Sequence, residues 1–280
     1  MILPILALNI ALIGYPLLYL LYMSLNDYDV IRGKMNFVGL KNYLDAIQDP
    51  ATVGAIPRTI LFSATVVAAS VLLGLAMALL LNEDFRGRSV LRTIVLVPWG
   101  VSEFATSAIW RFILSDSFGS LNGLLYALGL IKNYQLWLSE QMAIFWVAAA
   151  FAWHFTPLGA FFLLASLQTI PQDIHKAAKV DGAGPFRRFW NVTLPHIRYA
   201  VLIVLVLATM EAFRAFDVFY VMTGGGPGVA TEVLTFHIYR QEFYYFNLGG
   251  AAATSYILTL IILVLAAVYF VMLTRRRRGR

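Results

Sequence analysis

The chain of 280 residues contains no cysteine, which excludes disulfide bonds and thiol chemistry. Charge is also scarce. Asp, Glu, Lys and Arg together make up 13% of the residues, about half of their share in an average soluble domain. Apolar residues instead make up 60%. This balance excludes an ordinary soluble domain and points to a protein that meets lipid over much of its surface.

Six long apolar segments account for this composition, and each can cross a hydrocarbon core of ~30 Å as a helix. Backbone groups in lipid must be bonded internally, and the alternating strands of a barrel would not give such runs. We therefore predict an all-α integral membrane protein with six transmembrane helices. They are Leu3–Met23, Thr59–Leu81, Leu91–Leu114, Met142–Leu167, Ala200–Met222 and Ala251–Leu273. The first is too long for a signal-peptide core, so we expect it to be retained.

The usual signs of an enzyme are missing from the sequence. The glycine-rich stretch Gly224–Gly228 lacks the Lys-Ser/Thr that completes a phosphate-binding loop, and no Walker A motif occurs elsewhere. The four histidines, His154, His175, His196 and His237, are not spaced as metal ligands. We expect neither ATP hydrolysis nor a metal site or cofactor in this chain.

Lys and Arg are distributed unevenly between the two sides of the predicted spans. The loops 82–90 and 168–199 with the tail after Leu273, counting the adjacent Arg92, carry 13, and the other loops carry 6. The positive-inside rule therefore predicts that both termini are cytoplasmic. The arginine run Arg275–Arg280 follows a span directly, which is typical of an anchor to anionic lipid rather than of a nucleic-acid site.

A polar, basic stretch, Ile170–Ile197, separates the fourth and fifth predicted spans. Pro171 can begin a helix because the first helical position needs no N–H, and Ala177–Ala178 are strong helix formers. Gly182 and Gly184 then end the helix. The stretch predicts one short amphipathic helix whose small-residue face allows close docking. On these residues alone, an ordinary cytoplasmic loop is the alternative.

This pattern resembles the "EAA" loop of ABC-importer permeases, with Ala177-Ala178, Asp181-Gly182-Ala183 and Leu194-Pro195 at the family's spacing. In that family the short helix fits a groove on the ATP-hydrolysing subunit and couples the two proteins. The resemblance implies this coupling role for Lys176, Ala177, Ala178, Asp181, Gly182 and Ala183. The family usually has Glu at the position of Lys176, so any salt bridge made by that Glu is not carried over, whereas docking is.

The resemblance extends over nearly the whole chain. Phe37–Tyr43, Trp110–Leu138 and Phe216–Pro227 look like segments of the carbohydrate-uptake branch of type I importers, which includes the maltose and glycerol-3-phosphate systems. The chain is similar to the first permease of such a pair, the maltose-F-like or glycerol-phosphate-A-like member. This implies a first transmembrane helix and external segment in residues 1–56, a type-1 permease core in 57–274 containing the coupling loop 169–196, and a basic cytoplasmic tail in 275–280.

The resemblance also implies a set of partners and a location. They are a second permease, two ATPase subunits that carry ATP and Mg, an external solute-binding protein, a sugar-like substrate and membrane lipid, with no nucleic acid. The location would be the cell (inner) membrane of a bacterium or archaeon. A stand-alone secondary transporter or channel is the alternative, but such proteins often contain internal repeats and none is found here.

Apart from Arg92 at the edge of a span, five charged residues fall within the predicted spans, namely Glu103, Arg111, Glu211, Arg214 and Asp217, and His154 lies near the middle of another. Such groups are costly in a membrane and usually face a cavity or a partner. Glu211, Arg214 and Asp217 are spaced i, i+3, i+6 along one helical face. They form either an internal ion-pair ladder or the lining of a polar substrate path.

The resemblance places Glu211 where the family contacts sugar, and it places Phe151–Pro157 on the other sugar-contacting span. Aromatic faces pack against sugar C–H surfaces and polar side chains bind hydroxyls, so Trp153, His154 and Thr156 complete the candidates for the substrate path. Simple core or belt packing is the alternative for Trp153. Pro157 is positioned to break its helix and open backbone groups to a cavity.

Overall fold

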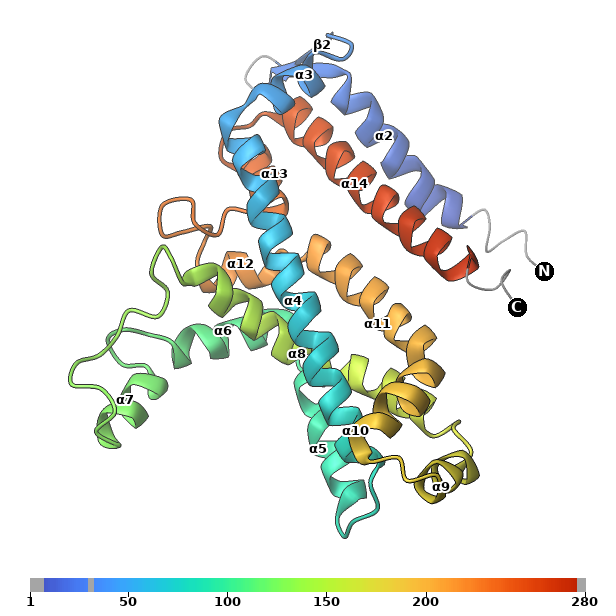
Figure 1. Ribbon diagram of the computed structural model, residues 1–280. Coiled ribbons are helices and arrows are strands. Elements are labelled where there is room, and N and C mark those ends of the chain that lie inside the picture. Colours follow the sequence, from blue (N-terminus) through green and yellow to red (C-terminus); the bar gives the residue numbers. More distant parts are fainter. Residues whose placement is uncertain (1–7, 30–32, 276–280) are drawn as a thin grey trace. The chain divides into compact units, whose positions relative to one another are not determined.

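In the computed structural model, which describes residues 8–29 and 33–275, the chain is mostly helical (Figure 1). It forms two compact units. One contains Met1–Thr59 and Glu232–Leu265, and the other contains Ile60–Thr231 and Ala266–Arg280. The first residues of the first predicted span, up to residue 7, and the basic tail from residue 276 lie outside the described residues.

In the first unit, two apolar helices lie side by side (Figure 1). They are α2 (Tyr15–Ser24), preceded by the π-helical turn η1 (Ile10–Gly14), and the first part of α14 (Leu248–Arg275). The Tyr256 hydroxyl on α14 donates a hydrogen bond of 2.5 Å to the Leu17 carbonyl on α2. The start of α14 also packs closely against strand β1, which begins at Asn26: a Cβ on Gly249 would lie 2.3 Å from the Asn26 carbonyl oxygen.

The remaining elements of the first unit are short. Strands β1 (Asn26–Asp29) and β2 (Lys34–Phe37) form an antiparallel hairpin in which Asn26 pairs with Phe37. Helix α3 (Lys41–Gln48), the first turns of α4 (Pro50–Asn82) and helix α13 (Leu234–Phe243) complete it. The described residues of the predicted external segment therefore form a strand pair and a helix between α2 and α4.

The second unit is built around α8 (Ala143–Leu167), which packs against α5, α6, α11 and α12. Its apolar stretch is 67% buried, against 28% or less for the three other long apolar helices. Small residues permit the close packing: a Cβ on Gly159 would lie 3.0 Å from Val204 of α11. The other elements are α5 (Arg88–Gly100), α6 (Glu103–Ile113), α7 (Ser120–Ala127), α9 (Gln172–Val180), α10 (Pro185–Arg188), η2 (Phe189–Thr193), α11 (Leu194–Arg214) and α12 (Asp217–Met222).

Among the described residues, four helices are long and apolar enough to cross a membrane: Pro50–Asn82, Ala143–Leu167, Pro185–Arg214 and Leu248–Met272. The apolar helix Ile10–Ser24 is shorter. The all-α membrane fold is confirmed, whereas the count of six spans stays a prediction.

The third predicted span, Leu91–Leu114, is not one helix. Helix α5 ends at Gly100, and α6 begins at Glu103. Between them, the Ser102 side chain caps α6 by accepting a hydrogen bond of 3.3 Å from the Ala105 amide, which satisfies one of the donors left free at a helix start. The Pro98-x-Gly100-x-Ser102 order favours such a break, and the prediction of a continuous helix was wrong.

The fifth predicted span, Ala200–Met222, is wrong at both ends. The helix already begins at Pro185 and continues through η2 to Arg214. At Ala215 the backbone leaves the helix (φ −57°, ψ 125°), and α12 begins at Asp217. The expectation that Pro157 breaks α8 is also wrong, because α8 continues through it. Pro157 is buried among packed helices, where one lost hydrogen bond is tolerated.

Candidate substrate path and coupling helix

The two candidate aromatic and imidazole side chains of α8 have partners on the broken helix pair α5 and α6. Trp153 is 42% exposed, and its ring meets Trp110 of α6 edge-to-face with centroids 6.2 Å apart. Such pairs fix ring orientation. Trp153 therefore presents an oriented aromatic surface outside the core of this chain.

His154 is held by the break between α5 and α6. Its Nδ1 lies 2.9 Å from the Pro98 carbonyl oxygen, which has no acceptor role within α5 because this helix ends two residues later. A carbonyl can only accept a hydrogen bond, so Nδ1 carries the proton. The Nε2 atom is then the polar atom of His154 left for a further partner.

Glu211 and Arg214 form an ion pair of 3.6 Å in the last turn of α11, with 47% and 68% of their side chains exposed. Asp217 does not extend this pair along one helical face, because α11 ends at Arg214 and Asp217 begins α12. Within residues 8–29 and 33–275, the continuous ladder that the i, i+3, i+6 spacing left as one alternative is therefore not formed, and only the Glu211–Arg214 pair is. Two charged side chains remain at the end of a membrane-crossing helix, facing away from the core of this chain.

The breaks in the two predicted spans come together, because α6 packs against α12. The Glu103 carboxylate at the start of α6 accepts a hydrogen bond from the Val218 amide and lies near the charges of Asp217 and Glu211. Arg111, further along α6, donates a 3.0 Å hydrogen bond to the Val221 carbonyl on α12. Short helix ends with polar side chains therefore meet beside α8, which is how transporter folds place polar groups at membrane depth.

Thr156 differs from the other candidates. It is 1% exposed, and its hydroxyl has no hydrogen-bond partner among the described residues. The side chain lies inside the helix packing of this chain and not on its surface. Its role in a substrate path stays a prediction.

The predicted docking helix is α9, and its C-terminal cap follows from Gly182. The Gly182 amide bonds the Lys179 carbonyl at 3.1 Å, and the Ala183 amide bonds the Ala178 carbonyl at 2.9 Å. This pair of bonds is a Schellman cap, which needs a residue with positive φ. Gly182 supplies it with φ +76°, and Asp181 is the last residue before the turn. Pro171 precedes the helix as its N-cap and is not its first residue.

Helix α9 contributes no buried residue to its own chain. Only His175 and Ala178 are half-buried, whereas Ala177 and Val180 are exposed, Val180 at 88%. Lys176, in the position of the family's Glu, pairs with Asp173 across one turn at 3.1 Å, and both side chains are largely exposed. A small, partly apolar face is therefore free for a protein partner.

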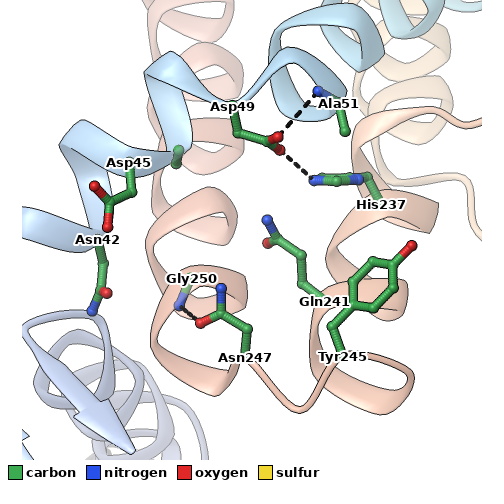
Figure 2. Close-up of a pocket in the computed structure, with 10 residues that line it drawn as sticks. Asn42, Asp45, Asp49, Ala51, His237, Gln241, Tyr245, Asn247 and Gly250 are labelled. Carbon is green, nitrogen blue, oxygen red and sulfur yellow. Dashed lines mark hydrogen bonds and ion pairs between the residues drawn. The ribbon is translucent and has the colours of Figure 1, made fainter.

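A polar pocket in the first unit was missed by sequence reasoning (Figure 2). It has a volume of about 470 Å³, and its lining includes Asn42, Asp45, Asp49, His237 and Gln241. Asp49 precedes Pro50 and caps α4 through the amides of Ala51 (3.3 Å) and Thr52 (2.9 Å). The order Asp-Pro-x-Thr was the available signal for this cap.

A buried acidic residue, Glu232, holds the pocket-lining His237 in place. Glu232 is 2% exposed and bonds His237 Nδ1 at 2.8 Å as well as the Arg240 guanidinium. Burial alone would raise the pKa of Glu232, but the His237 hydrogen bond and the charges of Arg240 and His237 outweigh it and lower the pKa. The same balance holds for Asp49, where burial is outweighed by hydrogen bonds from Thr52 and Ala51 and the pKa is lowered. Both carboxylates are therefore ionised at neutral pH.

These features define the class of the protein: a mostly helical, multi-pass membrane protein with an exposed helix, α9, between two long apolar helices and with polar helix ends within its apolar segments. The family described as "Binding-protein-dependent transport system inner membrane component" matches residues 70–278. The chain belongs to this family and is a permease subunit of an ABC importer, a transport component and not an enzyme.

Two named relatives agree with this assignment, and a solved structure shares the fold. The chain is 38% identical over 250 residues to the trehalose/maltose transport system permease protein MalF of Thermococcus litoralis, covering 89% of this chain and 83% of the relative. It is 31% identical to the sn-glycerol-3-phosphate transport system permease protein UgpA of Agrobacterium fabrum, covering 88% and 84%. A bacterial ABC transporter involved in alginate import shares the fold, with a TM-score of 0.84 at 21% identity over 98% of this chain and 94% of that chain.

Proposed function

We propose that this chain forms, together with a second permease subunit, the translocation path for a sugar or a related polyol or sugar phosphate delivered by an external binding protein. The observation that carries this proposal is the exposed Glu211–Arg214 pair. Charged side chains exposed within an apolar, membrane-crossing segment are costly unless they face water or a partner. A water-filled path shared with a second permease removes that cost and makes the carboxylate available to hydroxyl groups.

The substrate class is supported by the relatives, whose names refer to trehalose, maltose, sulfoquinovosyl glycerol and glycerol-3-phosphate. These solutes share several hydroxyl groups on a compact carbon frame. Trp153 offers an oriented aromatic face, and His154 and Glu211 offer polar atoms. This combination of aromatic and hydrogen-bonding groups suits a polyhydroxylated solute.

In this proposal, α9 docks on one of two ATPase subunits, which carry ATP and Mg, while this chain carries no cofactor. Both termini face the cytoplasm of a bacterial or archaeal cell, and the solute-binding protein approaches from the opposite side. The exposed face of α9 with Ala177 and Val180, and the excess of basic residues in the loops on that side, support this arrangement.

The proposal can be tested by reconstitution. The chain, its second permease and the ATPase subunits are placed in lipid vesicles, and uptake of maltose, trehalose and glycerol-3-phosphate is measured with and without binding protein. We expect uptake of a hydroxylated solute only with ATP and binding protein present. Uptake by this chain alone, or uptake that is indifferent to the binding protein, would contradict the proposal.

A further inference from the structure

A second polar pocket lies in the second unit, between helix α9 and the ends of the long helices α4 and α8. It has a volume of about 460 Å³. Its lining comes from the end of α4, the end of α8, helix α9 and the start of the α10–α11 helix. The lining residues are Leu79, Asn82, Glu83, Leu167, His175, Lys179, Pro185, Arg188, Phe189 and Thr193.

Three of the lining side chains are hydrogen-bond donors without acceptors. Among residues 8–29 and 33–275, no hydrogen bond or ion pair engages the side chains of His175, Lys179 or Arg188. Arg188 is half-buried, and its Nε atom is fully buried and unpaired. The buried Nε atom is closed to the pocket, so an acceptor group there would meet the rest of the half-buried Arg188 guanidinium, which also has no partner among the described residues.

The excess of basic over acidic lining residues favours an anionic acceptor group. Lys179 and Arg188 are cationic, and Glu83, the one acidic lining residue, is exposed. Phosphate oxygens match the planar fork of Arg, and Lys is a common second partner of phosphate. His175 and Lys179 lie one turn apart on α9, so both project toward the same side of the helix.

We propose that this pocket binds a phosphate group, held by Arg188 and Lys179. The group is the headgroup phosphate of an anionic phospholipid or a free phosphate ion. The apolar lining residues Leu79, Leu167 and Phe189 suit the acyl side of a lipid headgroup. Basic pockets between membrane helices on the cytoplasmic side bind such headgroups. Because the pocket includes α9, bound phosphate would steady the helix that docks on the ATPase subunit, whichever solute is carried.

The test uses the importer complex in nanodiscs of phosphatidylcholine alone or mixed with phosphatidylglycerol. Lipid retention is measured by native mass spectrometry, and thermal unfolding is followed in parallel. We expect the wild type to retain phosphatidylglycerol selectively. Arg188→Gln should weaken this retention about tenfold, the effect of losing one charge-assisted contact, and Lys179→Gln should weaken it as well. Arg187→Gln is the matched control, because Arg187 is exposed and does not line the pocket.

A second measurement separates the two sources of phosphate. The complex in neutral detergent is titrated with inorganic phosphate. If the free ion is the ligand, the unfolding midpoint rises in the wild type and in Arg187→Gln but not in Arg188→Gln. If both anions act equally on the wild type, Arg188→Gln and Lys179→Gln, the proposal is wrong. It is also wrong if the variants lose ATPase-subunit binding while anion binding is unchanged, since the pocket would then take a protein carboxylate.

Discussion

The Glu211–Arg214 pair allows the substrate path to be tested with one substitution, Glu211→Gln. The two side chains are 3.6 Å apart and 47% and 68% exposed. A solvated pair of this kind contributes about 0–1 kcal/mol to stability. If the pair lies in a water-filled path, removing the Glu211 charge should leave assembly and basal ATPase activity close to the wild type.

Uptake should respond much more strongly than assembly. A hydrogen bond between a sugar hydroxyl and a carboxylate contributes about 1.5–3 kcal/mol, which corresponds to a fall in uptake of roughly tenfold to a hundredfold. The assay is uptake by reconstituted complexes across a panel of sugars. Glu140→Gln, the same substitution at an exposed loop residue, is the control. Selectivity between sugars should change as well, because a site built for hydroxyls discriminates through paired polar groups.

Two results would refute this reasoning. Wild-type uptake and selectivity in Glu211→Gln, with normal expression, would show that the carboxylate does not contact the solute. Full transport by the swapped double variant Glu211→Arg with Arg214→Glu, together with poor assembly of each single variant, would show that the residues only pair with each other. Poor assembly is expected in that case because a charge left without its partner inside the membrane is destabilising.

Three further predictions concern coupling, topology and pH. Gly182→Leu should uncouple uptake from the ATPase activity that loaded binding protein stimulates. The reason is that φ +76° at Gly182 strains any side-chain-bearing residue by about 1–2 kcal/mol and so disturbs the cap of α9. Gly184→Ala, at φ −62°, is the control and should leave coupling unchanged. A cysteine at Ser120 should react with an impermeant thiol reagent added outside, whereas one at Gly184 should not; the reverse pattern would overturn the orientation. The pKa of Glu232 is lowered in the folded protein, so its ionised form stabilises the fold above the usual Glu pKa of about 4.3. This contribution is lost as the pH falls through the lower folded pKa. The free energy of unfolding should therefore fall more steeply with acid in the wild type than in Glu232→Gln.

Much of the fold follows from the sequence, since long apolar runs and the cap at Gly182 are local signals. The break at Val101–Ser102 was also signalled, by Pro98, Gly100 and the capping Ser102, but the apolar run around it outweighed those residues. The break at Ala215 has no comparable signal, because no Gly or Pro occurs there. It depends on the packing of α12 against α6, a contact between residues about a hundred positions apart that periodicity does not reveal.

For the candidate site, too, the sequence predicted some features and the packing of the helices determined the others. Spacing alone placed Glu211, Arg214 and Asp217 on one face, and the end of α11 separates the third from the other two. The partners of Trp153 and His154, namely Trp110 and the Pro98 carbonyl, come from a different predicted span. Such partners depend on how helices pack, so the sequence indicated which side chains are polar but not which atoms they leave free.

The revised bounds of the fifth span connect the two candidate sites directly. The helix from Pro185 to Arg214 has 30 residues, about 45 Å at 1.5 Å per residue. It begins just after the cap of α9 and ends at the Glu211–Arg214 pair. A displacement of α9 on an ATPase subunit would therefore reach Glu211 and Arg214 through the capped turn 181–184 and then one helix. The only irregular stretch along it is the π-helical turn η2, Phe189–Thr193, next to Arg188 of the proposed phosphate pocket. A ligand in that pocket would act at the point where this helix departs from regular α-helical geometry.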